Sequence, residues 1–219
     1  METTANHENK DVERAVIGGS STEALAGAAA VVLAILGLAQ IEPRLMIAIA
    51  AIALGAALIF DGTAVAAEYA RILARSGNGA IQNVELGGGI STQIGGGVAA
   101  GVLGVLALLN LDATALMAIA AIVLGATMVF SSGVSTRLNA LKIETSNDHE
   151  IAKRVAREAL TAATGTEVLV GLAAVVLGIL ALVGIDPTTL ILVAMLALGA
   201  SVLLTGSAVV GKMLSVFSG

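Results

Sequence analysis

The chain has no cysteine, few aromatic residues and little charge. Among its 219 residues, aromatic residues make up 2% and charged residues 12%, and there is no Trp. The absence of cysteine excludes disulfides, thiolate catalysis and metal sites built on cysteine. The aromatic belts that usually mark the two membrane interfaces are also missing. The charged fraction is about half that of an average soluble domain.

The residues that are present are mostly apolar. Hydrophobic residues make up 57% of the chain, and its mean hydropathy is +0.97. A soluble core of this size has no room for so much apolar surface, so the sequence predicts a lipid bilayer as the solvent. The net charge of -5 argues against nucleic acid as a partner.

Six apolar runs are each close to the length that crosses a bilayer, about 17–25 residues. They cover Ala24–Ile41, Leu45–Phe60, Ile94–Leu111, Ala113–Phe130, Val168–Ile185 and Leu190–Val210. The short turns IEPR, LDAT and IDPT join them in pairs, and helices joined so tightly are antiparallel neighbours. The sequence therefore predicts an all-α membrane protein with six transmembrane helices in three hairpins.

The three hairpins align with one another without gaps. Adding 70 to a residue number of the first hairpin gives the matching position in the second, and adding 144 gives that in the third. AIAAIALGA from Ala48 thus matches AIAAIVLGA from Ala118 and LVAMLALGA from Leu192. Such internal similarity indicates tandem repeats. We expect three parallel repeats in a pseudo-threefold bundle whose axis lies along the membrane normal.

The predicted segments and their orientation follow from this alignment. They are an N-terminal segment (1–21), hairpin repeat 1 (22–76), a Gly-rich linker (77–91), hairpin repeat 2 (92–143), an amphipathic helix (144–165) and hairpin repeat 3 (166–219). Arg44 is the only one of the 11 basic residues in a hairpin turn. The positive-inside rule therefore predicts a multi-pass protein of the cell (inner) membrane, with both termini, the N-terminal segment and the amphipathic helix cytoplasmic.

Small residues recur at spacings that let helix backbones approach closely in lipid. The candidates for helix packing are Gly27, Gly55, Gly97, Gly101, Gly125, Gly171, Gly178 and Gly199. The favoured interpretation is packing within one chain, and the alternative is an interface between copies of the chain.

Polar residues recur near the cytoplasmic ends of the hairpins. Glu23 and Asp61 lie equally far from Glu42 along the chain, so an antiparallel hairpin places them at similar depth. The full candidate layer is Thr22, Glu23, Asp61, Thr92, Gln93, Ser131, Thr166, Glu167 and Thr205. One interpretation is helix capping, because Ser20-x-x-Glu23 and Thr164-x-x-Glu167 fit the capping box. The other is a ring of acceptors at the inner mouth of a pore.

A second acidic set lies in the turns. Glu42, Asp112 and Asp186 each precede a helix, and Pro43 and Pro187 follow two of them. This pattern predicts N-caps, with proline at the first helical position.

The three hairpins have the form shown by VVLGILALVGIDPTTLILVAMLALGASVLLTG from Val175. They resemble the HdeD-like family of small bacterial membrane proteins. The resemblance covers Gly27 to about Gly206 and depends on the LG(I/V)LAL run, the acidic-Pro turn and the later LGA. It implies six spans built from two-helix repeats, and a role in stress, because the founding members of the family are linked to acid resistance.

No motif for catalysis, cofactor or metal binding is evident. No nucleophile and base pair stands out, and neither His7 nor His149 has metal-ligand spacing. We expect a non-enzymatic integral membrane protein without cofactor, acting as a self-associating structural, stress-protective or accessory subunit. One alternative is a channel or carrier for protons or small solutes. Another is a subunit of a larger membrane complex, docked through residues 147–160.

Overall fold

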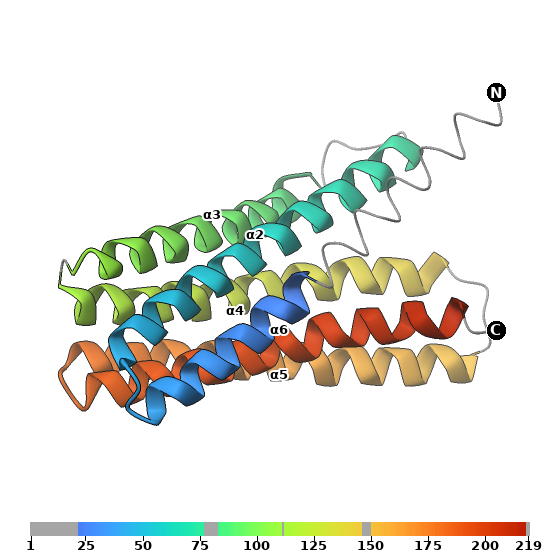
Figure 1. The fold of residues 1–219 in the computed structure, drawn as a ribbon. Coiled ribbons are helices and arrows are strands. Elements are labelled where there is room, and N and C mark those ends of the chain that lie inside the picture. Colours follow the sequence, from blue (N-terminus) through green and yellow to red (C-terminus); the bar gives the residue numbers. More distant parts are fainter. Residues whose placement is uncertain (1–21, 77–82, 111, 146–149, 218–219) are drawn as a thin grey trace.

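The computed structural model describes residues 22–76, 83–110, 112–145 and 150–217. These residues form six helices and no strand (Figure 1). The helices are Thr22–Leu38, α2 (Pro43–Ser76), α3 (Asn83–Leu108), α4 (Ala113–Thr145), α5 (Glu150–Leu182) and α6 (Pro187–Phe217). The prediction of an all-helical protein is confirmed for this part of the chain.

Five of the helices contain a segment long and apolar enough to cross a membrane. These segments are Pro43–Thr63, Ser91–Leu108, Ala113–Ser132, Gly165–Leu182 and Pro187–Ser207. The helix Thr22–Leu38 is apolar but shorter. The chain is therefore a membrane-embedded protein.

Two helices begin earlier than the sequence indicates. Helix α3 starts at Asn83, so much of the segment expected to be a Gly-rich linker (77–91) is helical. Helix α5 runs without interruption from Glu150 to Leu182, which joins the amphipathic segment to the fifth apolar run. Neither stretch contains proline, and glycine is tolerated in membrane helices. The segment 1–21 lies outside the described residues.

The three hairpin turns lie at the same end of the molecule (Figure 1) and share one backbone conformation. The second residue after the end of each first helix has a left-handed φ, at Gln40 (64°), Asn110 (61°) and Gly184 (91°). In the first turn the Gln40 N–H donates to the Gly37 carbonyl at 3.0 Å, and the Ile41 N–H donates to the Leu36 carbonyl at 3.1 Å. This is the Schellman arrangement, which satisfies the last carbonyls of a helix.

The second helix of each hairpin begins directly after the acidic turn residue. The carbonyls of Glu42, Asp112 and Asp186 accept the first i→i+4 bond, each at 3.1 Å. Pro43 and Pro187 are the first residues of α2 and α6. The N-cap positions are therefore confirmed. The three acidic residues also have a positive φ of 36–40°, which the sequence pattern does not reveal.

Helices α2, α4 and α6 form the inside of the bundle. They contact one another, and half of each span is buried, compared with 28% for α3 and 22% for α5. The outer helices present Val, Ile and Leu on their exposed faces, as at Val102 and Val176. Large apolar side chains suit a surface that faces lipid.

Paired glycines bring outer and inner helices into backbone contact. A Cβ placed on Gly97 of α3 would lie 2.6 Å from the Gly55 carbonyl oxygen of α2, and one on Gly171 of α5 would lie 2.6 Å from the Gly125 carbonyl oxygen of α4. A Cβ on Gly27 would lie 2.9 Å from the Gly199 carbonyl oxygen of α6. The first helix of the described chain therefore packs against the last.

Other glycines make related contacts. A Cβ on Gly178 would lie 2.6 Å from Ile122 Cγ1, whereas one on Gly101 meets nothing within 4 Å. Gly101 instead offers its backbone nitrogen, 2.9 Å from the Cβ position of Gly55. The sequence analysis missed Gly104, where a Cβ would lie 2.9 Å from the Ala48 carbonyl oxygen. Its alignment with Gly178 is the signal that would have found it.

Candidate functional site

The space between α2, α4 and α6 is closed by two layers of apolar side chains. The layers are Leu54, Leu124 and Leu198, followed by Leu58, Met128 and Val202. The cavity that these six side chains enclose has a volume of about 10 Å³. A water molecule needs about 10–15 Å³ and several polar partners. The centre of the bundle is therefore dry and sealed at this depth.

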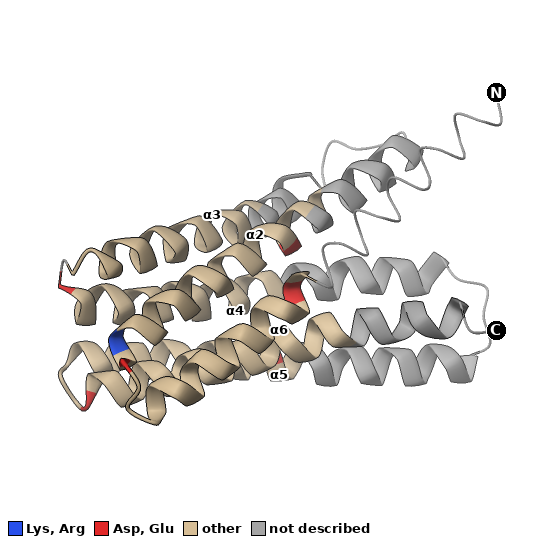
Figure 2. Ribbon diagram, viewed as in Figure 1, with Lys and Arg blue, Asp and Glu red and all other residues tan. Residues whose placement is uncertain are grey.

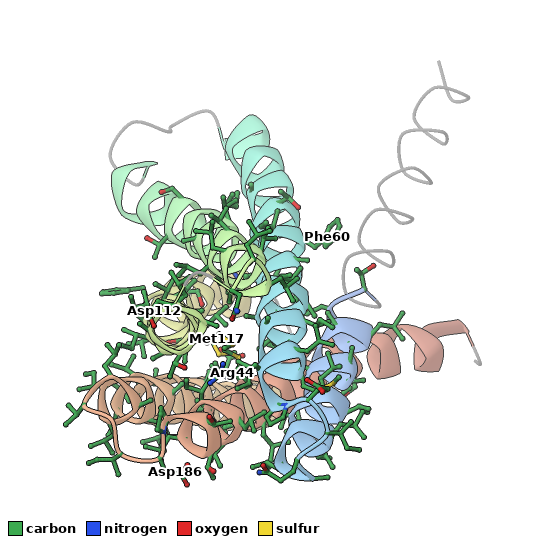
Figure 3. All side chains as sticks on the ribbon, turned by 60° about the vertical axis from the view of Figure 1, so that its left-hand side comes forward. Arg44, Phe60, Asp112, Met117 and Asp186 are labelled. Carbon is green, nitrogen blue, oxygen red and sulfur yellow. The ribbon has the colours of Figure 1, made fainter. Side chains whose placement is uncertain are left out.

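The closed region continues toward the turns. Three further side chains lie two helical turns closer to the hairpin turns than the leucine layer does. They are Ile47, Met117 and Ile191, and each is at most 2% exposed. Met117 lies in the middle of the bundle in Figure 3. The stretch from Ile47 to Leu58 covers about 16 Å at 1.5 Å per residue. We call this buried stack between α2, α4 and α6 the apolar plug.

The predicted polar layer begins one helical turn beyond the apolar plug. Asp61 follows Leu58 on α2, and Gln93 of α3 donates a hydrogen bond from Nε2 to Asp61 Oδ2. On the other side of the bundle, Thr205 of α6 donates to Glu167 Oε1 of α5 at 3.0 Å. The layer therefore links two pairs of helices by side-chain hydrogen bonds.

Glu23 brings a third carboxyl group to the same region. Its side chain is 8% exposed, and it interacts electrostatically with both Asp61 and Glu167. These acids come from three different helices (red, away from the turns, in Figure 2). Among the residues whose side chains are described, Arg44 is the only basic one, and it lies at the opposite end of the bundle. We call Glu23, Asp61 and Glu167 the carboxyl cluster.

The other predicted members of the layer also have interactions. Ser131 Oγ donates to the Met128 carbonyl of its own helix at 3.1 Å. Thr22, Thr92 and Thr166 also have interactions, so none of these hydroxyls is free. The structure thus joins Asp61 to Gln93 and Glu167 to Thr205 by hydrogen bonds across helices. Glu23 interacts electrostatically with the two acids.

Helix capping does not explain the third-hairpin acid. The capping box Thr164-x-x-Glu167 needs a helix that begins at these residues, but α5 begins at Glu150. This interpretation was wrong, because the amphipathic segment and the apolar run form one helix. Gln93 is likewise inside a helix, since α3 begins at Asn83. Ser20, the other expected cap, lies outside the described residues.

The sequence analysis missed polar residues that are buried among the helices. Thr127 is 3% and Ser201 is 7% exposed, and they occupy aligned positions of α4 and α6. Thr127 Oγ1 donates to the Val123 carbonyl at 2.7 Å. Such a bond to the preceding turn satisfies a hydroxyl group in a dry environment. The alignment of the hairpins, which places Ala57 at the same position, is the signal that could have found them.

The carboxyl cluster does not have the arrangement of a metal site. Among the described residues, no group of three His, Cys, Asp or Glu side chains is close enough to hold a metal ion. Three carboxyl groups that interact electrostatically can bind protons, and when ionised they attract cations.

Comparison with known proteins gives no match to a protein family, a curated protein or a solved structure. The class of protein, a membrane-embedded helical bundle, therefore comes from the chain itself. Its function has to be argued from the apolar plug and the carboxyl cluster.

Proposed function

We propose that this chain is a non-enzymatic, six-span membrane protein built from three tandem hairpin repeats, and that it acts as a structural or accessory component of the bilayer. The observation that carries the proposal is the apolar plug. Leu54, Leu124 and Leu198 occupy aligned positions of the three hairpins and leave about 10 Å³ between the inner helices. Such a centre supports a packing role in preference to transport.

The pseudo-threefold arrangement has its main support in the glycine contacts. The pairs Gly55–Gly97, Gly125–Gly171 and Gly199–Gly27 each join the second helix of one hairpin to the first helix of the next. The last pair closes the series on itself. Because the helix Thr22–Leu38 makes the same contact as α3 and α5, we count it as the sixth span. The cytoplasmic location of both termini remains part of the proposal, based on the basic residues.

Self-association is a further part of the proposal. The glycines that suit close helix contacts are largely occupied within the chain, as at Gly27, Gly55 and Gly97. Two copies of the chain would therefore contact each other through larger exposed side chains, such as Val102 and Val176. Native mass spectrometry from lipid nanodiscs tests this, and a purely monomeric protein would refute it. The stress-protective role rests on the resemblance to the HdeD-like family alone.

A second candidate function is a channel or carrier for protons or small solutes. The carboxyl cluster favours it, because three acids on three helices gather with no basic side chain among the described residues near them. An ionisable group within a membrane protein is commonly functional. This candidate requires a second conformation in which the apolar plug opens.

Flux measurements in proteoliposomes distinguish the two functions. The natural protein is compared with a Glu23→Ala, Gln93→Ala, Glu167→Ala triple variant and with empty liposomes, while an ionophore shows that the assay responds. We expect folded natural protein to give no flux of protons or small solutes above that of empty liposomes. Flux that falls in the triple variant would overturn the structural role and establish the channel or carrier.

A third candidate, a subunit of a larger membrane complex, depends on the segment 147–160. Most of this segment belongs to α5, and a partner docked there would co-purify in fixed stoichiometry. Purification from native membranes in mild detergent is the test, with a chain lacking the segment as the control.

A further inference from the structure

A second cavity lies at the turn end of the bundle, far from the carboxyl cluster. It has a volume of about 450 Å³, and it lies between the first and third hairpin turns. Gln40, Glu42 and Arg44 line one side, and Asp186, Thr188 and Thr189 line the other. Small-molecule sites commonly have volumes of about 300–1,000 Å³. We call this the turn cavity.

The turn cavity contains charges of both signs that are not paired with one another. Arg44 is the only basic residue among the described side chains, and within the described part of the chain it forms no salt bridge with Glu42 or Asp186. Figure 3 shows Arg44 and Asp186 at the same end of the molecule, on different hairpins. A guanidinium and two carboxylates that face one open space can bind a ligand with both charges.

The backbone adds a preference for where each charge of the ligand binds. Arg44 is the second residue of α2, and Thr188 and Thr189 are the second and third residues of α6. The free N–H groups and the positive end of the dipole at these two helix starts favour an anion. The anionic group of a ligand therefore belongs beside Arg44 and the threonine hydroxyls. A cationic group belongs beside Glu42 and Asp186.

The depth of the turn cavity indicates the source of such a ligand. It lies at the ends of the spans Pro43–Thr63 and Pro187–Ser207, where lipid headgroups meet a membrane protein. Phosphoethanolamine carries a phosphate and a primary ammonium with three hydrogen-bond donors. A phosphocholine group has no such donors, so its cation makes weaker contacts with carboxylates.

We propose that the turn cavity binds a phosphoethanolamine group through Arg44, Thr188 and Thr189 on the phosphate and through Glu42 and Asp186 on the ammonium. The second hairpin has Thr114 where the first has Arg44, so one chain holds one such site. Binding at the turn cavity is independent of whether the centre of the bundle conducts protons or solutes.

The test is lipid selection by the full chain. Protein in nanodiscs made from equal parts of phosphatidylethanolamine and phosphatidylcholine is transferred to mild detergent, and retained lipid is measured by native mass spectrometry. We expect about a tenfold excess of retained phosphatidylethanolamine, which corresponds to about 1.4 kcal/mol. Equal retention of the two lipids by the natural protein would overturn the proposal.

Three variants test the two charges separately. Arg44→Thr, which installs the residue of the aligned positions, should reduce retention of both lipids. Glu42→Gln with Asp186→Asn should keep lipid bound but abolish the preference for phosphatidylethanolamine. The matched control is Asp112→Asn in the second hairpin turn, which does not line the cavity and should leave the preference unchanged. Circular dichroism confirms that each variant is folded. Folded Arg44→Thr that retains as much lipid as the natural protein, or folded double variant with natural selectivity, would refute the site.

A competition experiment distinguishes the two sources of this chemistry. Free phosphoethanolamine is added to the detergent-solubilised protein that carries bound lipid. Displacement of the lipid would identify the headgroup alone as sufficient, and a soluble molecule as a possible natural ligand. Retained lipid would assign the site to the membrane phospholipid.

Discussion

Gly55 of α2 and Gly97 of α3 lie backbone against backbone. A Cβ placed on either glycine would be 2.6 Å from the carbonyl oxygen of the other. The relationship is mutual, so neither residue accepts a larger side chain without moving a helix. Gly125 and Gly171 repeat it between α4 and α5, with distances of 2.5 and 2.6 Å. These pairs fix how closely the outer helices approach the inner ones.

Substitution of these glycines should therefore destabilise the bundle. We expect Gly55→Ala to lower the free energy of unfolding by about 1–3 kcal/mol, the usual effect of overpacking. Gly95→Ala is the matched control, because a Cβ there meets nothing within 4 Å. Reversible unfolding in mixed micelles, followed by circular dichroism, measures both. Equal stability of the two variants would contradict the close contact.

The positions of the turns between helices could be predicted from the sequence. The helices that pack against one another across these turns could not. The alignment and the turns IEPR, LDAT and IDPT depend on local chain chemistry, which a sequence displays directly. The partner of Gly55 is Gly97, on the next hairpin, and spacing along the chain does not reveal such a choice. Which helices are inside was also hidden, because the inner spans and those of α3 and α5 are all long and apolar enough to cross a membrane.

The polar layer illustrates the same limit. Aligned positions correctly grouped Glu23, Asp61 and Glu167 at one depth, as their electrostatic interactions indicate. The capping interpretation of Glu167 was wrong because α5 begins at Glu150, so the Thr164-x-x-Glu167 pattern lies inside a helix. A capping box is a local pattern, and it does not reveal that the preceding amphipathic segment joins the apolar run in one helix.

The apolar plug should contribute strongly to stability. Leu124 is 1% exposed and contacts the closed centre of the bundle, so Leu124→Ala should leave a cavity and cost about 2–5 kcal/mol. Val102→Ala on the exposed face of α3 should cost little. Unfolding midpoints of the two variants in the same micelles provide the measurement. A plug variant as stable as the surface variant would show that the centre is not tightly packed.

The hydrogen bond between Gln93 and Asp61 should couple α3 to α2. A double-mutant cycle with Gln93→Leu and Asp61→Leu should give a coupling energy of about 0.5–2 kcal/mol, the range found for interhelical bonds in membranes. The control cycle pairs Gln93→Leu with Ser207→Ala on α6, whose exposed hydroxyl donates to the Leu204 carbonyl of its own helix. Coupling near zero in the first cycle would mean that the two side chains are independent.

The aligned turn residues share a left-handed φ but differ in side chain, so substitutions in one turn can be compared with substitutions in another. Gln40 and Asn110 have φ values of 64° and 61°, whereas the aligned residue of the third turn is Gly184, with φ of 91°. A left-handed conformation costs a residue with a side chain about 1–2 kcal/mol, and glycine avoids most of this cost.

Gln40→Gly and Asn110→Gly should therefore raise the free energy of unfolding, by up to about 1 kcal/mol, with the larger gain at Gln40 because asparagine tolerates this conformation better. Gly184→Gln should lower it by about 1–2 kcal/mol. Opposite signs for Gln40→Gly and Gly184→Gln in the same unfolding assay would verify the shared turn geometry. A loss of stability in Gln40→Gly would mean that the Gln40 side chain stabilises the turn more than its backbone strains it. Because Gln40 also lines the turn cavity, the measurement is made in detergent without phospholipid, where bound headgroups add nothing to the stability.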